Sequence, residues 1–178
     1  MLMNIKGTES EKNLRAAFAG ESMARNKYTY FAEYARKQGD SNVAEVFERL
    51  AKNEMMHAKF WFELMYGKNT PTLDNLMVAV KGEHEEFANM YPEFAATARR
   101  EGLDELAVMF ERVAAIESSH EKEFLKLIAA ISNKEESAEK VVKSAHRCQF
   151  CGHITSERLD VCPVCEAIGS WDSVTVEE

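Results

Sequence analysis

Apolar side chains recur at steps of three and four along four segments of this chain, which is the spacing of helices that bury one face. The second segment has the seam Val43, Phe47, Leu50, Glu54, His57, Trp61 and Leu64. The fourth has the seam Leu106, Phe110, Val113, Glu117, His120, Phe124, Leu127 and Ile131. In both seams a Glu-x-x-His pair occupies positions at which a buried helix face would carry apolar residues.

The first and third segments also place a carboxylate on the apolar face. The first carries Leu14, Glu21, Tyr28 and Ala35 at steps of seven. The stripe of the third is Leu76, Val80, Glu83, Phe87, Met90 and Phe94, with Glu86 beside it. Each of the four predicted helices therefore directs at least one carboxylate toward the interior.

Turn and capping residues separate these helices. Thr8 or Ser10 is suited to cap the first, Gly39-Asp40-Ser41 separates the first from the second, and Gly102 precedes the fourth. Gly67-Lys68-Asn69-Thr70-Pro71 forms the middle connection, which must cross between two helical hairpins.

The two hairpins are copies of each other. A shift of 63 residues places Tyr28 on Tyr91, and it superimposes both members of the two Glu-x-x-His pairs. Upstream, Glu21 aligns with Glu83 only at a shift of 62, so one extra residue lies between Glu83 and Tyr91. Because a helix can absorb an extra residue as a π-bulge, we expect the third helix to be distorted there.

Several carboxylates in a dry interior require positive charge. An unpaired buried carboxylate costs several kcal/mol, whereas a whole domain is stable by only about 5–15 kcal/mol. Arg25, Lys52 and Lys59 lie to the side of the seams, which leaves divalent metal ions as the source of charge. One Glu from each of two helices and a Glu-x-x-His from each of two others is the pattern of ferritin-like di-iron proteins. The predicted ligands are Glu21, Glu54, His57, Glu83, Glu117 and His120, with Glu86 as a further candidate.

All four cysteines lie near the end of the chain, as Cys148-Gln-Phe-Cys151 and Cys162-Pro-Val-Cys165. Two Cys-x-x-Cys knuckles ten residues apart indicate a tetrahedral metal site, which zinc or iron could fill. So short a segment needs the metal to fold, and we expect Phe150, Ile154 and Trp171 to pack around it.

Length and composition agree with two modules. The 178 residues are 46% hydrophobic, enough for one substantial core and a small second unit. We expect a mainly α chain: a four-helix bundle over residues 1–131, a linker over 132–146, and a small metal-knuckle β domain over 147–178.

Charge and hydropathy restrict the partners. The formal net charge is −8 and no basic stripe is evident, which argues against nucleic-acid binding. The first residues, Met1 to Lys6, lack an apolar signal-peptide core, and no stretch approaches membrane-spanning length. We expect a cytoplasmic protein with reduced cysteines and no membrane association.

Taken together, these residues resemble the rubrerythrins, which join a ferritin-like di-iron domain to a rubredoxin-like domain. The resemblance covers essentially the whole chain. It rests on the segments 19–28, 82–86 and 90–92, on both Glu-x-x-His pairs, and on the Cys-x-x-Cys-Gly and Cys-Pro-x-Cys knuckles.

The resemblance implies a peroxidase that reduces hydrogen peroxide to water at two iron ions. Electrons would pass from a rubredoxin or an NAD(P)H-dependent reductase through one iron held by Cys148, Cys151, Cys162 and Cys165. It also implies a homodimer, in which the four-cysteine iron of one subunit approaches the di-iron site of the other. Glu86 would bind iron in the oxidised state and His57 would replace it on reduction, while Tyr28 and Tyr91 either hydrogen-bond the ligands or simply pack in the core.

Two positions depart from the rubredoxin pattern: Glu166 stands where free-standing rubredoxins have Gly, and His153 where they commonly have Tyr. Zinc therefore stays an alternative to iron. An iron-handling protein that oxidises ferrous iron for storage is the main alternative function, although storage has no obvious need for an electron-transfer module. A zinc-loaded, redox-silent scaffold is the third.

Overall fold

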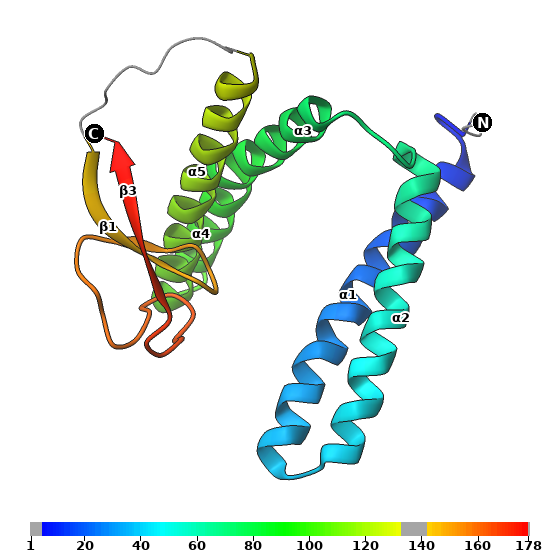
Figure 1. The fold of residues 1–178 in the computed structure, drawn as a ribbon, viewed down its shortest axis with the longest axis horizontal. Coiled ribbons are helices and arrows are strands. Elements are labelled where there is room, and N and C mark those ends of the chain that lie inside the picture. The colour runs from blue at the N-terminus through cyan, green and yellow to red at the C-terminus, as the bar shows by residue number, and fades with distance from the viewer. Residues whose placement is uncertain (1–4, 133–141, 178) are drawn as a thin grey trace. The chain divides into compact units, whose positions relative to one another are not determined.

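The computed structural model describes residues 5–132 and 142–177, and its contacts divide the chain into two units at Thr70/Pro71. The first unit is a hairpin of two long antiparallel helices, α1 (Glu9–Gln38) and α2 (Ser41–Tyr66), which lie side by side (Figure 1). The Thr8 hydroxyl accepts a hydrogen bond from the Glu11 amide at 3.2 Å, which confirms Thr8 as the first cap. Gly39 ends α1 in the left-handed region, at φ 88°.

The second unit begins with a helix that changes its winding. It contains α3 (Thr72–Glu85), a π-helical turn η1 (Glu86–Met90) and α4 (Tyr91–Arg100) in direct succession. The turn starts immediately after Glu85 and ends before Tyr91, which confirms the distortion that the extra residue predicts. The long helix α5 (Asp104–Ser132) then packs against α3, η1 and α4 (Figure 1).

The duplication predicted from the sequence is visible in the packing of the two units. The first hairpin buries Ala32, Ala35 and Ala44 against Phe47. The second buries the residues 63 positions later, which are Ala95, Ala98 and Ala107 against Phe110. Small residues at these crossings let each pair of helices approach closely, and both hairpins do so in the same way.

Each hairpin leaves much of its apolar seam open to solvent within its own unit. Phe31 and its repeat equivalent Phe94 are 42% and 43% exposed, and Leu127 on α5 is 51% exposed. Exposed apolar surface of this kind is typical of a face that packs against a further element or partner. Each hairpin therefore presents an apolar face that its own unit does not cover.

The cysteine module is a small antiparallel sheet. Its strands are β1 (Val142–Cys148), β2 (Ile154–Thr155) and β3 (Trp171–Glu177), in the order β2-β1-β3, with Cys148 opposite Trp171. Cys148, Cys162 and Trp171 form its core, with Val164 and Ala167 packed against them.

Two expectations for this module are wrong. Phe150 does not pack around the cysteines, because it is 73% exposed at the tip of the first knuckle, whereas Trp171 is buried as expected. Strand β1 begins at Val142, inside the range 132–146 that was expected to be a linker. The residues of β1 are short or polar, so their pairing with β3 is not evident from apolar periodicity; residues 133–141 of that range lie outside the described residues.

Among the described helices, none has a stretch long and apolar enough to cross a lipid bilayer.

Candidate metal centres

A first cluster of potential ligands lies between α1 and α2. His57 Nδ1 is 2.8 Å from Glu54 Oε2 and 3.8 Å from Glu21 Oε2. The three ligand atoms lie within 4.8 Å of one another, and both carboxylates are half-buried. Because Glu54 and His57 are three residues apart on α2, they share the face that packs on α1.

A second cluster repeats this arrangement in the other hairpin. His120 Nδ1 is 2.7 Å from Glu117 Oε2 and 3.5 Å from Glu83 Oε2, and all three residues are half-buried. Glu83 comes from α3, whereas Glu117 and His120 come from α5. The structure thus brings the six predicted ligands together as two equivalent half-sites, each with two carboxylates and one imidazole.

The second half-site carries an electrostatic strain that a cation would relieve. Burial raises the pKa of Glu83 and the adjacent Glu117 carboxyl raises it further, while His120 acts in the opposite direction. Two close carboxylates cannot both stay ionised at low cost without a positive partner. Carboxylate oxygens and imidazole nitrogens are ligands that suit divalent transition metals, so the donor set fits the iron pair predicted from the sequence.

Glu86 lies apart from these two clusters of ligand atoms, as the first residue of the π-helical turn. It faces the same region, since burial and then the charge of Glu86 raise the pKa of Tyr91, with smaller contributions from Glu117 and Glu83. The extra residue in the turn shifts the register between Glu83 and Tyr91 and so brings the phenol into the field of these carboxylates.

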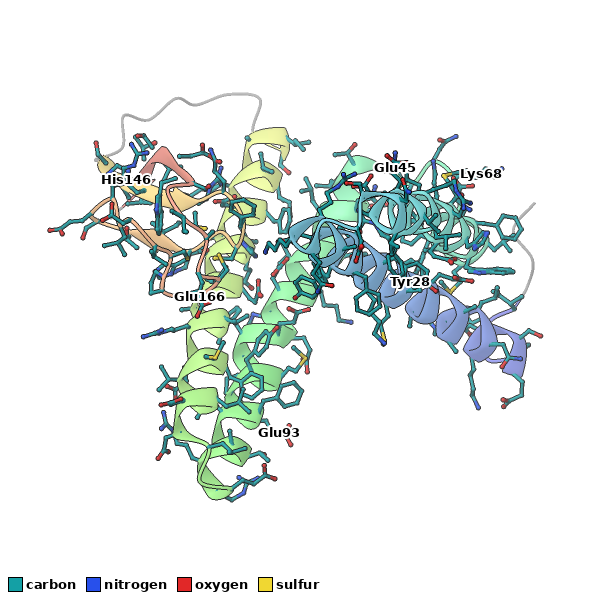
Figure 2. All side chains as sticks on the ribbon, turned by 90° about the horizontal axis from the view of Figure 1, so that it is seen from below. Tyr28, Glu45, Lys68, Glu93, His146 and Glu166 are labelled. Atoms are coloured by element: carbon teal, nitrogen blue, oxygen red, sulfur yellow. The ribbon has the colours of Figure 1, made fainter. Side chains whose placement is uncertain are left out.

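The two tyrosines occupy equivalent places in the two hairpins. Tyr28 lies on α1 (Figure 2) and is half-buried. Its ring centroid is 5.8 Å from that of Phe47. Tyr91 is half-buried as well, with its ring 6.1 Å from that of Phe110. Both tyrosines therefore pack in the apolar seam. In addition, the nearby predicted ligand carboxylates raise the pKa of Tyr91.

The four cysteines converge into one site. Cys148 Sγ and Cys165 Sγ are 3.6 Å apart, as are Cys151 Sγ and Cys162 Sγ. A disulfide would need about 2.05 Å, whereas four sulfurs at about 2.3 Å from one ion lie about 3.8 Å apart. The spacing fits a tetrahedral metal site, for which zinc and iron are both chemically suitable.

The backbone of the two knuckles is the same. The amides of Gly152 and Glu166 each donate to the carbonyl of the Cys four residues earlier, both at 3.0 Å. Gly152 has φ 77°, and Glu166, at the equivalent place, has φ 59°. The Glu that departs from the rubredoxin pattern therefore adopts a left-handed conformation that favours glycine.

Hydrogen bonds around Cys148 favour its thiolate, whereas burial raises the pKa of Cys151 in the same knuckle. Burial alone would also raise the pKa of Cys148, but hydrogen bonds from the amides of Cys151 and Phe150 and from the thiols of Cys165 and Cys162 together outweigh it and lower that pKa to about 7. A thiolate is the form that binds a metal ion. His153 is the second position that departs from the rubredoxin pattern. Burial and the charge of Arg112 lower its pKa, and its ring lies 6.4 Å from that of Trp171.

Within the second unit, the cysteine module lies against α5 and its half-site. Arg112 Nη1 donates to the Pro163 carbonyl at 2.8 Å. The module also approaches α5 closely at Gly152, because a Cβ built there would be 2.5 Å from His120 Nε2. The first knuckle therefore adjoins a predicted ligand of the same chain, a contact that the sequence analysis missed because no local pattern encodes it.

A further pair that the sequence analysis missed links α3 to α5. His84 Nδ1 lies 2.8 Å from Glu121 Oε1. His84 directly follows Glu83, and Glu121 is one helical turn after Glu117. In the sequence Glu121 directly follows the predicted ligand His120, but nothing in the apolar pattern distinguishes Glu121 from a solvent-exposed charged residue.

Known proteins resemble the chain over nearly its whole length. The rubrerythrin family model matches residues 12–72 and 74–166. A rubrerythrin of Porphyromonas gingivalis is 39% identical, over 93% of this chain and 89% of that protein. A rubrerythrin of Nitratidesulfovibrio vulgaris is 36% identical, over 92% and 93%. A solved nigerythrin structure, titled as its fully reduced, all-ferrous state, is 29% identical over 97% of this chain and 92% of that one, with a TM-score of 0.40.

Proposed function

Because the chain belongs to the rubrerythrin family, we propose that it is a peroxidase that reduces hydrogen peroxide to water. The reaction H2O2 + 2 e⁻ + 2 H⁺ → 2 H2O needs a two-electron reductant and two protons. A pair of ferrous ions, when bound, would supply both electrons, and the four-cysteine iron would restore them one at a time.

The proposed pair is held by Glu21, Glu54 and His57 from one half-site and by Glu83, Glu117 and His120 from the other. The four carboxylates match the charge of two divalent cations, so the loaded site is close to neutral. This balance is what makes so many acidic groups tolerable in the interior of a bundle.

Glu86 and His57 are the proposed exchangeable ligands. A fifth carboxylate suits a ferric pair, whereas the neutral imidazole of His57 keeps a ferrous pair closer to neutrality. Two features support this proposal. Glu86 begins the π-helical turn, separate from the tighter clusters, and His57 is the more exposed imidazole, with 57% of its side chain accessible against 33% for His120. Both side chains therefore have room to move.

Tyr91 is proposed to donate its phenolic hydrogen to a ligand carboxylate and to hold that carboxylate in place. Its raised pKa supports this role, because a phenol beside acidic groups stays protonated and remains a donor. Tyr28 is proposed to do the same in the first hairpin.

One observation carries the proposal: the first cysteine knuckle lies directly against His120. A redox-active iron beside a ligand of the metal pair is an electron entry point, which a peroxidase needs. Oxidation of ferrous iron for storage has no use for incoming electrons. We propose a rubredoxin or an NAD(P)H-dependent reductase as the donor, a cytoplasmic location and a homodimeric assembly.

Replacing Glu86 by Ala tests the exchange of ligands. The iron-loaded, reduced Glu86→Ala protein is expected to consume peroxide at least about tenfold more slowly while it keeps its iron content. Glu93→Ala, which removes an exposed carboxylate from α4 (Figure 2), is the matched control and should behave as wild type. Unchanged turnover in Glu86→Ala rejects the exchange. Rapid ferrous oxidation with mineral formation, without peroxide consumption, would favour iron handling instead.

A further inference from the structure

We propose that Arg112 raises the reduction potential of an iron ion bound by the four cysteines, and so makes the cysteine module a better electron acceptor. Arg112 belongs to α5 and is neither a cysteine nor a member of a half-site. The inference rests on the iron proposed above for the cysteine site, but not on peroxide chemistry. It follows from the place that α5 gives to one guanidinium group beside the second knuckle.

The Arg112 side chain reaches from α5 to the second knuckle. Its Nη1 atom donates to the carbonyl oxygen of Pro163 at 2.8 Å. Pro163 directly follows Cys162 and stands two residues before Cys165, so this carbonyl belongs to the loop that carries two of the four sulfurs. An arginine side chain stays protonated in proteins, so the contact brings a permanent positive charge to the cysteine site.

No carboxylate pairs with this charge within residues 5–132 and 142–177. The neighbouring Glu111 is bound instead by Arg99, and the only polar side-chain contact of Arg112 in that part of the chain is the one to Pro163. Burial, and then the charge of Arg112, lower the pKa of His153, which follows Gly152 in the first knuckle. The charge of one guanidinium therefore acts on both knuckles.

Reduction makes the cysteine site more negative. Four thiolates bring four negative charges, so the site has one net negative charge with a ferric ion and two after one electron arrives from the donor protein. A nearby cation stabilises the more negative form and thereby raises the reduction potential. Because Arg112 is exposed, solvent screens part of its effect. We expect it to favour the reduced form by about three- to tenfold, which for one electron is about 28–59 mV.

The internal duplication provides an arginine for comparison. Arg49 stands 63 positions before Arg112, at the equivalent place on α2. The glutamates that precede the two arginines form equivalent ion pairs, which are Arg36–Glu48 and Arg99–Glu111. The Arg49 side chain makes no hydrogen bond or ion pair with the described residues, whereas that of Arg112 binds the second knuckle. Arg49 therefore serves as the matched control.

A neutral substitution tests the proposal in the iron-reconstituted full chain. The reduction potential of the cysteine site is measured by redox titration, followed through the visible band of the iron–thiolate centre, so no enzymatic activity is required. Arg112→Gln should lower the potential by about 28–59 mV, whereas Arg49→Gln should leave it at the wild-type value. An unchanged potential in Arg112→Gln overturns the proposal. A reconstituted wild type without the visible band would instead refute iron at the four cysteines, on which the proposed function depends.

Two further variants separate the charge of Arg112 from its hydrogen bond and from the docking of the module. Arg112→Lys keeps the charge and should keep most of the wild-type potential; a fall as large as that of Arg112→Gln would overturn the role of charge. Glu123→Gln weakens another contact between α5 and the module, in which Arg147 Nη1 donates to Glu123 Oε1 at 3.0 Å. Since it removes a negative charge, the potential should stay the same or rise. A fall would show that docking, and not charge, sets the potential.

Ionic strength gives an independent check of the electrostatic cause. The Debye length falls from about 30 Å at 0.01 M salt to about 3 Å at 1 M, so high salt screens the charge of an exposed side chain. The difference in potential between the wild type and Arg112→Gln should therefore shrink by about half or more over this range. A difference of the same size at both salt concentrations would overturn the electrostatic origin of the effect.

Discussion

Gly152 allows the cysteine module to approach the second half-site, and replacing it by Ala should disturb that approach. The residue has φ 77°, where a Cβ costs about 1 kcal/mol. The same Cβ would lie 2.5 Å from His120 Nε2 and 3.5 Å from Ile116 Cγ2. Ordinary contacts begin near 3.4 Å, so the knuckle and the imidazole must separate by about 1 Å. Overpacking of this size adds about 1–3 kcal/mol.

Gly169→Ala is the matched control, because Gly169 has φ 63° in the same module and no neighbour within 4 Å of its would-be Cβ. It should lose only the conformational cost. Unfolding in guanidinium chloride, followed by the visible band of the iron–thiolate centre, should therefore show Gly152→Ala to be about 1–3 kcal/mol less stable than Gly169→Ala. Stopped-flow reoxidation of that centre by peroxide should be slower in Gly152→Ala alone. Equal behaviour of the two variants would show that the knuckle does not rest on His120.

Three further substitutions test the second cysteine knuckle, the role of Tyr91 and the metal dependence of the cysteine module. Glu166→Gly should stabilise the cysteine module by about 0.5–1 kcal/mol, because Glu166 has φ 59° and glycine adopts this angle without strain. A lower unfolding midpoint for Glu166→Gly than for the wild type in the same guanidinium assay would contradict this prediction. Tyr91→Phe should slow peroxide turnover several-fold, since it removes the proposed hydrogen-bond donor. The free energy of unfolding should change by at most about 1 kcal/mol, because the ring still packs against Phe110. Unaltered turnover would show that Tyr91 is only a packing residue. Cys148→Ser should abolish metal binding by the module and unfold it, while circular dichroism of the helices is preserved; a variant that still holds a four-coordinate metal would show that the site is formed differently.

The helical part of the fold follows from the sequence because its signals are local and repeated. Seam spacing predicts the helices, and two interruptions of the seam by Glu-x-x-His predict the half-sites. The mismatch between the 62- and 63-residue shifts predicts the π-helical turn at Glu86–Met90. The first two inferences use residues within a few helical turns of each other, where periodicity reflects burial directly, and the third compares the two copies of the hairpin.

Features that depend on contacts between elements escaped prediction. The start of β1 at Val142 depends on pairing with β3, nearly thirty residues later, and its own residues carry no alternating apolar pattern. Phe150 was expected to be buried because it is aromatic, yet the knuckle leaves its tip in solvent. The contact of Gly152 with His120 joins two modules whose sequences are unrelated, so neither contains a sign of it. Glu166 was predicted in part. Comparison with rubredoxins shows that the residue type is unusual at this position, but only the structure shows its left-handed backbone angle.

Acidic and imidazole groups from both hairpins are proposed to bind a pair of metal ions. Anomalous scattering at the iron edge, from crystals of iron-reconstituted protein, locates every bound iron without reference to activity. We predict one peak among the four cysteines and two more between Glu21, Glu54 and His57 on one side and Glu83, Glu117 and His120 on the other. A peak at the cysteines alone, with those six side chains free of metal, would contradict it.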